Sequence, residues 1–497
     1  MERPLIRHEQ SLRSITEFLG LENLANDVKI SGMTHSSKEI EKGDIFLAFP
    51  GAKTHGANFA AQAREYGALA VLTDPMGKQI IEKISPGLPT LVVENPRRVA
   101  GVLGAWFYGE PMRNMFCVGI TGTNGKTTTT TLLYQIWTLA GKESGLIGTV
   151  ETRIGSELLK SQRTTPESSD LQSLAATMQE RHIQNLAMEV SSHAISLERI
   201  RGSHFAVVAF TNLSQDHLDY HGTMDEYFRV KSALFSYEYA DLAVINVDDP
   251  HGVLLAESIH IPMRTLSRAN PRADWNYVSA FAHPLGNDVA IRGPGGILIE
   301  GLLPLYGEYN LDNALMAVAL AVESGIGPVE IAAILPLLSA AQGRLEAVVV
   351  GQNFSAFVDY AHSPDAVTRV LETCRAMSLG KVIAVLGCGG DRDPSKRALM
   401  GAALGKGSDI AVFTSDNPRS EDPLRILDQM TSSLAVVSPN RVIPDRRSAI
   451  EYAVEQAHPG DLVVILGKGH ETGQEVAGVV TPFDDRLVLA QAIEGRK

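Results

Sequence analysis

The chain has 497 residues and a formal net charge of −13, from 44 Lys and Arg against 57 Asp and Glu. Its length suggests about three domains at ~150 residues each, and 44% hydrophobic with 20% charged residues excludes a disordered or fibrous protein. The negative charge disfavours broad nucleic-acid binding, which needs many cations along a phosphate backbone, but it permits a local site for a small anion.

The cysteines and the apolar segments indicate the compartment. Cys117, Cys374 and Cys388 are few and far apart, which disfavours a disulfide framework and is typical of a reducing compartment. The N-terminal segment carries charges throughout and lacks the apolar core of a signal peptide. No stretch reaches the ~18 apolar residues that a membrane span needs. We therefore expect a soluble, cytoplasmic protein with no membrane or nucleic-acid partner.

Short apolar runs alternate with amphipathic segments of helix length, which predicts an α/β fold with parallel sheets and crossover helices. In the first block the expected strands cover 44–49, 68–73 and 90–94, and the expected helices 59–67 and 97–107. Gly109 and Pro111 then mark a boundary near residue 110.

The second and third blocks continue this alternation. In the second block the expected strands cover 116–120, 185–190, 206–210 and 242–247, followed by an antiparallel hairpin region around 265–310 and helices around 311–325 and 328–340. In the third block the expected strands cover 355–360, 381–387, 409–415 and 461–467, and the helices include 397–407 and 446–458.

A Gly- and Thr-rich loop, TGTNGKTTTT at 121–130, lies between a predicted strand and a predicted helix. Its two glycines permit a tight turn in which successive N–H groups surround a phosphate. Lys126 would reach the terminal phosphates, and the Thr127 hydroxyl would bind Mg²⁺. Ile120 stands where the strict template has glycine, so only the shorter form of the motif fits. The alternative is a turn with an exposed lysine, but the flanking strand and helix favour phosphate binding.

Polar residues follow two further strands of the second block. A carboxylate at the strand end, Glu189, can face a ligand crevice, although such a glutamate is more often a solvated surface charge. Two aspartates and two histidines fall within 216–221. Because Mg²⁺ prefers carboxylate and phosphate oxygens, His217 by local context is a hydrogen-bonded loop histidine. Lys231 by local context is a solvated lysine on a helix face.

Three polar loops follow three strands of the third block, at 387–397, 414–423 and 466–475. If these strands are parallel, the loops converge at one edge of the sheet. The guanidinium of Arg419 is suited to a carboxylate, and with Asn417 and Glu471 it would hold a carboxylate and an ammonium together, as an amino-acid end requires. Ordinary turn chemistry of Asp-Asn-Pro explains the segment equally well, so the local pattern leaves both interpretations open.

Nine motifs occur in one order along the chain: GTNGKTTT, EVSSHA, NLSQDHLDYHG, GEYNLDNALMA, GRLE, DYAHSPD, GGDRD, DNPR and GKGHE. This ordered set resembles the Mur ligase family, and the resemblance extends from THSSKEIEKGDIFLAFPG at 34–51 to the last loop. It implies a smaller α/β UDP-binding domain, a central P-loop ATPase-like domain with a parallel sheet that binds ATP, and a Rossmann-like domain for an acceptor amino acid. The limits expected for these domains are 1–110, 111–343 and 344–497.

Within that family the resemblance implies an ATP-dependent ligase of peptidoglycan precursor synthesis. It would add meso-diaminopimelate to UDP-N-acetylmuramoyl-L-alanyl-D-glutamate (the UDP-MurNAc-dipeptide) through an acyl phosphate, releasing ADP and phosphate. L-lysine as the acceptor, a folate-type glutamate ligase and a P-loop NTPase switch are the alternatives. We expect a monomer whose partners are these small-molecule substrates.

The resemblance also implies roles for individual residues. The catalytic residues would be Lys126, Glu189, His217 and Lys231, and the metal ligands Thr127, Glu189, His217 and Lys231, with Mg²⁺ as the metal and a carbamate on Lys231. Nucleotide contacts would come from Gly122, Thr123, Asn124, Gly125, Lys126, Thr127, Thr128, Asn313, Arg344 and Asp359. Substrate contacts would come from Ser37, Thr164, Thr165, Ser191, Arg199, Arg392, Asp416, Asn417, Arg419, Gly467 and Glu471. The chain departs from the family at 36–38, where Ser-Ser-Lys replaces the more frequent Asp-Ser-Arg.

Overall fold

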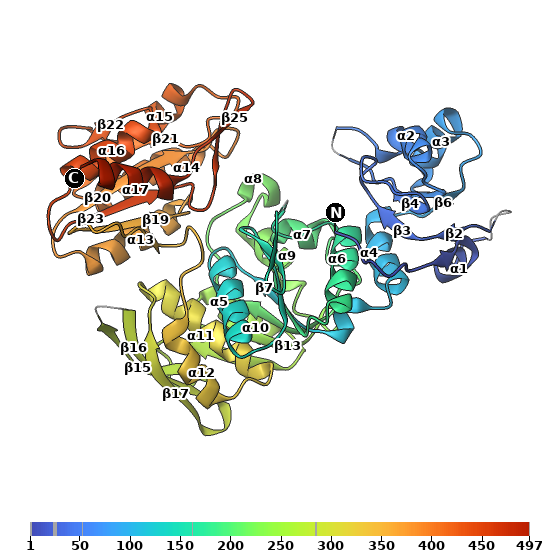
Figure 1. The fold of residues 1–497 in the computed structure, drawn as a ribbon, viewed down its shortest axis with the longest axis horizontal. Coiled ribbons are helices and arrows are strands. Elements are labelled where there is room, and N and C mark those ends of the chain that lie inside the picture. Colours follow the sequence, from blue (N-terminus) through green and yellow to red (C-terminus); the bar gives the residue numbers. More distant parts are fainter. Residues whose placement is uncertain (1, 23–26, 52, 162, 284–285, 497) are drawn as a thin grey trace.

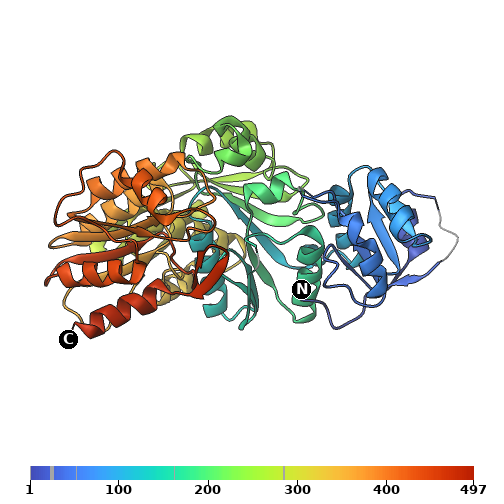
Figure 2. The same cartoon turned by 90° about the horizontal axis from the view of Figure 1, so that it is seen from above.

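Three α/β units follow one another along the chain in this computed structural model, which describes residues 2–22, 27–51, 53–161, 163–283 and 286–496. Figure 1 shows them side by side in sequence order, with the N-terminal unit (blue) and the C-terminal unit (orange to red) on opposite sides of the middle unit. The view from above gives the same order in an elongated molecule (Figure 2). The predicted three-part α/β organisation is confirmed. The limits predicted for the domains stay predictions, and residues 1 and 497 at their ends lie outside the described ranges.

The N-terminal unit contains a parallel sheet in the order β3-β4-β5-β6. Its elements are β1 (Gln10–Ser11), α1 (Leu12–Phe18), β2 (Lys29–Ile30), β3 (Gly32–Thr34), β4 (Asp44–Leu47), α2 (Ala60–Glu65), β5 (Ala70–Thr73), α3 (Pro75–Ile84), β6 (Thr90–Val92) and α4 (Pro96–Phe107). Helices α3 and α4 each begin with a proline after a capping residue, Asp74 or Asn95, whose side chain accepts a backbone N–H of the first turn. This start is favourable because proline lacks only an N–H that the helix leaves unpaired.

The middle unit is built on a sheet in which, within the described residues, eleven strands follow the order β10-β9-β8-β11-β7-β12-β13-β14-β15-β16-β17. Strands β8 to β15 in this order are parallel, whereas β9 and β10 at one edge and β16 and β17 at the other are antiparallel. The strands are β7 (Phe116–Thr121), β8 (Ser144–Ile147), β9 (Thr152–Ile154), β10 (Glu157–Leu159), β11 (Asn185–Glu189), β12 (Phe205–Phe210), β13 (Ala240–Asn246), β14 (Met263–Ser267), β15 (Trp275–His283), β16 (Gly286–Gly293) and β17 (Ile297–Leu303). The predicted hairpin region is thus confirmed, with residues 284 and 285 outside the described part.

The helices of the middle unit cover both faces of this sheet. They are α5 (Lys126–Leu139), α6 (Ser168–Glu180), α7 (Ser192–Ser196), α8 (Leu218–His221), α9 (Met224–Ser232), α10 (Pro250–Ser258), α11 (Glu308–Glu323) and α12 (Pro328–Ile334). Short 3₁₀ turns occur at Pro111–Asn114, Pro294–Gly296 and Leu335–Leu337, and at Gly56–Phe59 in the N-terminal unit.

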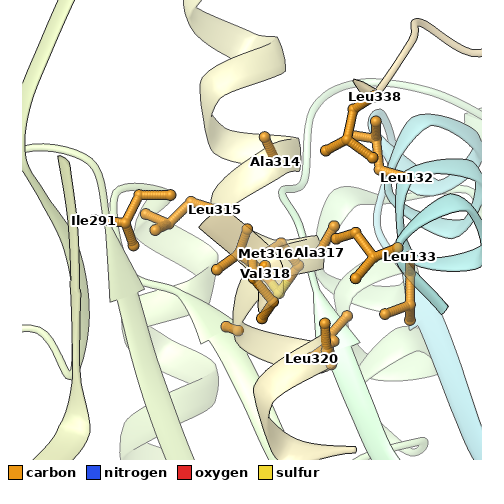
Figure 3. Packing of buried hydrophobic residues seen from close by; sticks show 14 of the residues in the cluster. Leu132, Leu133, Ile291, Ala314, Leu315, Met316, Ala317, Val318, Leu320 and Leu338 are labelled. Carbon is orange, nitrogen blue, oxygen red and sulfur yellow. The ribbon is translucent and has the colours of Figure 1, made fainter. Parts of the chain in front are cut away.

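Helix α11 packs through small and aliphatic side chains in the largest core of the middle unit. Figure 3 shows Leu315 and Val318 of α11 between Ile291 of β16 and Leu132 and Leu133 of α5. Alanines on α11 let the two helices approach closely, as interior packing at high density requires. The close approach brings the first turns of α11 next to the loop that precedes α5.

The C-terminal unit contains a sheet in the order β18-β19-β23-β20-β21-β22, parallel except for β18. Its elements are β18 (Glu346–Ala347), β19 (Ser355–Asp359), α13 (Pro364–Met377), β20 (Val382–Cys388), α14 (Ser395–Gly407), β21 (Ile410–Ser415), α15 (Pro423–Thr431), β22 (Arg441–Val442), α16 (Arg446–Gln456), β23 (Leu462–Leu466), β24 (Gly473–Val476), β25 (Val479–Pro482) and α17 (Asp485–Gly495). Two apolar clusters bury both faces of the sheet, as its continuous apolar strands require.

The structure bears on two expectations about the chain as a whole, one about disulfides and one about membrane-spanning segments. Cys117, Cys374 and Cys388 are buried and unpaired, so the absence of a disulfide framework is confirmed. Among the helices of the described ranges, none combines the length and the apolar character that crossing a bilayer requires.

Candidate active site

A cavity of about 860 Å³ lies where the carboxyl ends of the middle and C-terminal sheets face one another. Parallel strands place their following loops at this edge, so the loops after β7, β11, β12, β20, β21 and β23 all reach it. The predicted site residues that line it are Thr123, Asn124, Gly125, Lys126, Thr127, Thr128, Thr164, Thr165, Glu189, Ser191, Arg199, His217, Asn313, Arg344, Asp359, Arg392, Asp416, Arg419, Gly467 and Glu471.

The glycine-rich loop between β7 and α5 forms one wall of this cavity. Gly125 has φ +86°, and a Cβ there would lie 2.3 Å from Oδ1 of Asn313, so no larger residue fits. The side-chain Oδ1 of Asn212 accepts the Asn124 N–H at 3.0 Å, which holds the loop to the strand end of β12. The N-terminus of a helix as long as α5 directs unpaired N–H groups toward the cavity and favours an anion there.

Lys126 begins α5 and folds back over the loop. Its Nζ donates to the carbonyl oxygens of Gly122 and Thr123, both at 2.9 Å. Burial lowers the pKa of this amine, and Glu189 and Asp216 oppose that effect. The loop thus presents one cation and a helix N-terminus on the same side, which suits a polyphosphate.

Glu189 is buried at the end of β11, with 1% of its surface exposed, so it is not the solvated charge that an isolated strand-end glutamate would be. Its Oε1 accepts the Thr127 hydroxyl at 3.0 Å and the Thr149 N–H at 2.8 Å, and Oε2 accepts the Thr149 hydroxyl at 3.1 Å. From the C-terminal unit, Nη2 of Arg344 donates to the same Thr127 hydroxyl at 3.3 Å. A hydroxyl and a carboxylate held together in this way are oxygen donors of the type that Mg²⁺ accepts.

This donor set is too small to enclose a metal ion by itself. Across the described part of the chain, no three His, Cys, Asp or Glu side chains converge in a way that would hold one. Mg²⁺ usually keeps several waters and binds through one or two carboxylates together with substrate phosphates. The residues present therefore fit an ion that arrives with a nucleotide.

Lys231 contradicts the local interpretation of a solvated helix-face lysine. It has 1% of its surface exposed, and its Nζ donates to the carbonyl oxygen of Gly122 at 2.8 Å and lies 4.8 Å from the centre of the Tyr227 ring. The reason is helical spacing, because Lys231 shares with Tyr227 and Val230 the face of α9 that packs inward. Burial, with the nearby cation of Lys126, lowers the pKa of this amine well below its ordinary value. It lies directly behind the glycine-rich loop.

His217 stands at the cavity wall with a left-handed backbone (φ +53°) and 45% of its side chain exposed. Its Nε2 lies 3.3 Å from Oδ2 of Asp216, so it is a loop histidine with a polar partner, as its local context predicts. Surrounding protein, together with the charges of Lys126 and Lys396, lowers its pKa to about 4 even though Asp216 opposes the change. The imidazole is therefore neutral near pH 7, which is the form that binds metals.

Asp216 also joins the two units across the cavity. Nζ of Lys396, at the start of α14, lies 2.5 Å from Oδ1 of Asp216. Burial disfavours ionisation of Asp216, but His217, His362 and Lys396 together hold the pKa of this carboxyl well below its ordinary range. The pair is therefore ionic and ties α14 to the loop after β12.

The predicted nucleotide residues of the C-terminal unit occupy the opposite rim. Asp359, at the end of β19, accepts the backbone N–H groups of Leu345 at 2.6 Å and Ala361 at 2.7 Å. Burial raises the pKa of this carboxyl, against the effect of Arg344 and the two hydrogen bonds. The guanidinium of Arg344 lies over the Tyr360 ring, 4.6 Å from its centre. These contacts fix the segment that leads into the C-terminal unit.

Three of the predicted substrate-contact residues, Thr164, Thr165 and Ser191, lie beside Glu189. The Thr165 hydroxyl donates to the Glu189 carbonyl oxygen at 2.8 Å, and Thr164 and Thr149 hydroxyls lie 2.9 Å apart. Ser191 caps α7 by accepting the Ala194 N–H at 3.2 Å. The hydroxyls therefore surround the strand end from which the Glu189 carboxylate projects.

Arg199 connects this wall to the N-terminal unit. Its Nε lies 3.1 Å from one oxygen of Glu167, and Nη1 of Arg97, in α4, lies 2.9 Å from the other. Ser37, by contrast, lies outside the cavity lining, and its hydroxyl donates to Oε1 of Gln62 at 3.0 Å. The structure therefore does not bring Ser37 together with the other predicted residues.

The three polar loops of the C-terminal unit converge as predicted, because β20, β21 and β23 are parallel neighbours. Nδ2 of Asn417 donates to Oε2 of Glu471 at 2.7 Å, and Nη1 of Arg419 donates to the Gly390 carbonyl oxygen at 2.6 Å. Gly467 has φ +110°, and a Cβ there would lie 2.7 Å from Oδ2 of Asp416, so the close approach of these loops requires glycine. Asn417 lies just behind the cavity surface and contacts it through Glu471.

Several lining residues were not among the predicted site residues, including Thr149, His362 and Lys396. Thr149 follows β8, a parallel neighbour of β11, so the strand-end rule that singled out Glu189 would have found it. His362 lies within the motif DYAHSPD, and Lys396 lies in the polar loop at 387–397, three residues after GGDRD. Neither carries a local pattern that separates it from a surface residue.

Three family models match the chain in the order of its three units. The Mur ligase family catalytic domain matches residues 29–108, the Mur ligase middle domain 120–321, and the Mur ligase glutamate ligase domain 343–469. A UDP-N-acetylmuramoyl-L-alanyl-D-glutamate–2,6-diaminopimelate ligase of Streptomyces coelicolor is 46% identical over 498 aligned positions, covering 99% of this chain and 98% of that protein. A protein of the same name from Geobacillus thermodenitrificans is 41% identical over 477 positions, covering 94% and 96%.

Solved structures show the same fold. The structure of a UDP-N-acetylmuramoyl-L-alanyl-D-glutamate–2,6-diaminopimelate ligase matches with a TM-score of 0.69 and 31% identity, over 98% of this chain and 99% of that one. The MurF ligase of Thermotoga maritima in complex with ADP matches in fold with a TM-score of 0.64 and 16% identity, over 93% and 97%. With domain models along the whole length and relatives of this identity and coverage, the chain belongs to the Mur ligase family.

Proposed function

We propose that the chain is an ATP-dependent ligase that joins meso-diaminopimelate to UDP-N-acetylmuramoyl-L-alanyl-D-glutamate in peptidoglycan precursor synthesis. The observation that carries this proposal is a single cavity lined both by the phosphate-binding loop before α5 and by the three amino-acid-binding loops of the C-terminal unit. The names of the full-length relatives at 46% and 41% identity support the choice of substrates.

The reaction class follows from charge. A carboxylate is a poor electrophile, so one of its oxygens first attacks the γ-phosphorus of ATP, which gives an acyl phosphate and ADP. The neutral amine of the acceptor then attacks the acyl carbon, and the C–O bond to phosphate breaks with its electron pair, which gives the amide and phosphate. The amine proton is released in this second step.

Cationic residues of this chain would offset the repulsion between the substrate carboxylate and the phosphates of ATP, which are both anions. Lys126 and the N-terminus of α5 are placed to bind the phosphates and to stabilise charge that develops on them. Arg344, whose Nη2 contacts the Thr127 hydroxyl, brings a second cation from the C-terminal unit. Loops from both units line the same cavity and would orient the reactants there.

A role for Mg²⁺ belongs to the same proposal. The Thr127 hydroxyl and the Glu189 carboxylate, 3.0 Å apart, would hold one ion, and neutral His217 would contribute to a second. When bound, the ions would neutralise charge on the phosphates. The small protein donor set supports ions that bind together with the nucleotide.

We also propose that Lys231 carries a carbamate. Carbamylation requires the neutral form of the amine, which attacks the carbon of CO₂ and then loses a proton. A side chain that is ordinarily a cation thereby becomes an anionic oxygen donor. The burial of Lys231 and its lowered pKa support this modification, since they favour the neutral form. Its Nζ lies behind the phosphate loop, next to the Gly122 carbonyl oxygen, so the new oxygens would be close to Lys126.

The acceptor amino acid is the remaining part of the proposal, and the choice lies between meso-diaminopimelate and L-lysine. The distal end of meso-diaminopimelate carries an ammonium and a carboxylate, whereas that of L-lysine carries an ammonium alone. Arg419 would pair with the distal carboxylate, whereas the distal end of L-lysine offers no anion to this guanidinium, which disfavours L-lysine. The folate-type ligases share the fold at 19% identity over 75% of this chain, and that likeness favours no substrate.

An acceptor screen tests the function directly. Purified protein receives ATP, Mg²⁺, the UDP-linked dipeptide and, separately, meso-diaminopimelate, L-lysine or L-glutamate, and the product is identified by mass. We expect the meso-diaminopimelate adduct, with one phosphate released for each amide formed and none when the dipeptide is omitted. Phosphate release that ignores the dipeptide and the acceptor would indicate an NTPase switch instead.

A further inference from the structure

Lys468 is a fully buried lysine in the last of the three polar loops of the C-terminal unit, at 466–475, and the mechanism above does not use it. Its side chain has 0% of its surface exposed and lies between the end of β23 and the hairpin formed by β24 and β25. Burying an ammonium is costly unless it is paired and hydrogen-bonded, so a lysine in this position must have partners that compensate for the lost water.

The partners of Lys468 account for all its protons. Nζ donates to Oδ1 of Asn417 at 3.2 Å, to Oε2 of Glu471 at 3.2 Å and to the carbonyl oxygen of Gly473 at 2.6 Å. An ammonium has three N–H donors, so these three contacts use its full capacity. Lys468 therefore has no donor left for a ligand, and it can act on one only through its neighbours.

These contacts determine how Asn417 presents its amide. Its Oδ1 accepts from Lys468 and also from the Glu475 N–H at 2.9 Å, so the oxygen faces two donors. The amide nitrogen is thereby turned toward Glu471 and donates to Oε2 at 2.7 Å. With the amide reversed, its nitrogen would face the donors Lys468 and Glu475 N–H, so the present orientation is the only satisfied one.

The same arrangement gives the two carboxylate oxygens of Glu471 different partners. Oε2 receives both the Asn417 amide and the Lys468 ammonium. The Glu471 side chain is 31% exposed and lines the cavity, which leaves Oε1 to accept from a ligand. Two donors from the interior thus hold the carboxylate in one orientation at the cavity surface.

We propose that Lys468 is a positioning residue that orients Asn417 and Glu471 for the distal ammonium of the acceptor amino acid. The inference rests on the proposed function, since it assigns a role within the acceptor site of that reaction. Arg419, on the neighbouring loop, is the group suited to the distal carboxylate. Loss of Lys468 therefore weakens recognition of the ammonium more than recognition of the carboxylate.

Two acceptor amino acids distinguish recognition of the distal ammonium from recognition of the distal carboxylate. Meso-diaminopimelate carries both at its distal end, and 2-aminopimelate has the same chain length with a distal carboxylate and no distal amine. The measured quantity is the ratio of kcat/KM for the first to that for the second. The variant Lys468→Met keeps the length and burial of the side chain but has no hydrogen-bond donors. We expect the ratio to fall at least about tenfold in this variant, which is the size of effect expected for the loss of one charge-assisted hydrogen bond. The KM for ATP should stay unchanged.

Controls make each outcome decisive. Lys406→Met, an exposed lysine on α14 of the same unit, should leave the ratio unchanged. If Lys468→Met does not fold, Lys468→Gln, which keeps an uncharged amide donor group in place of the ammonium, is measured in the same way. An equal loss with both acceptors, or no loss, overturns the positioning role. A wild-type protein that forms no amide with meso-diaminopimelate would instead refute the proposed function.

Discussion

The phosphate-loop region of the middle unit and the acceptor region of the C-terminal unit each bury one lysine beside a loop that follows a parallel strand. Lys231 lies against a carbonyl oxygen, a hydroxyl and an aromatic ring, with the cation of Lys126 nearby. Lys468 lies against a carbonyl oxygen, an amide oxygen and the carboxylate of Glu471. The partners, rather than the burial, distinguish the two sites.

This difference decides what each amine can do. Without a carboxylate in contact, the Lys231 amine has its pKa lowered by burial and by a like charge, which favours its neutral, nucleophilic form. Lys468 is paired with an anion, so it is held as a donor that orients other side chains. The two proposals thus assign a reactive role to the buried lysine of one unit and a positioning role to that of the other.

The largest expected effect comes from removing the reactive amine. Lys231→Ala should lower kcat about a hundredfold or more, the range for losing one group that stabilises charge at a reacting phosphate. If a carbamate is the active form, short carboxylic acids such as acetate should restore part of the rate by supplying an anionic oxygen. Steady-state phosphate release with and without added acid measures both effects.

The matching control is the other buried lysine. Lys468→Ala should not respond to added acid, because its role depends on donors rather than on an anionic oxygen. Wild-type turnover in Lys231→Ala, or equal rescue of both variants, would contradict the contrast drawn between the two regions.

A smaller effect is expected on the carboxylate side of the acceptor site. Arg419→Ala should raise KM for meso-diaminopimelate at least about tenfold, as expected for removing a charged hydrogen-bond donor, and leave KM for ATP unchanged. Initial rates at varied acceptor and varied ATP give both constants. Arg441→Ala, an exposed arginine at the edge of the same sheet, should change neither. An unchanged acceptor KM in Arg419→Ala would remove this residue from the site.

The strands and the convergence of loops could be predicted from the sequence because both follow from local patterns. Apolar runs of strand length between helices gave the parallel sheets, and parallel strands necessarily bring Glu189 and the loop of Arg419 to carboxyl edges. The cap residues Asp74 and Asn95, each followed by proline, are equally local. Such features depend on residues that are neighbours in sequence.

The environment of single side chains could not be predicted in this way. Lys231 has the sequence context of a surface lysine, and its burial depends on α9 packing against a loop more than a hundred residues earlier. The Lys396–Asp216 contact joins two units across 180 positions, and no local pattern marks either residue as its partner. The placement of Ser37 outside the cavity likewise depends on how the N-terminal unit sits beside the middle one.

The smallest expected effect concerns His217, whose pKa the middle unit lowers, as it lowers the pKa of Lys231. Its pKa lies at about 4 in the folded protein against 6.5 for an unperturbed histidine. The unfolded chain therefore binds a proton that the folded one does not between these two values, and this lowers stability as pH falls from 6.5 toward 4. His217→Gln removes the titration, so its stability relative to wild type should rise over that interval and stay constant above it.

Denaturant midpoints at several pH values between 5 and 7.5 measure this effect, with His260→Gln, an exposed histidine of the middle unit, as the control. Because 45% of the His217 side chain is exposed, solvent screening keeps the shift in midpoint modest. The sign is the informative part. If the advantage of His217→Gln shrank on acidification, the imidazole would be protonated in the folded protein and stabilised by Asp216. The middle region would then hold a paired cation, as the C-terminal region does at Lys468, and the contrast between the two regions would apply to Lys231 alone.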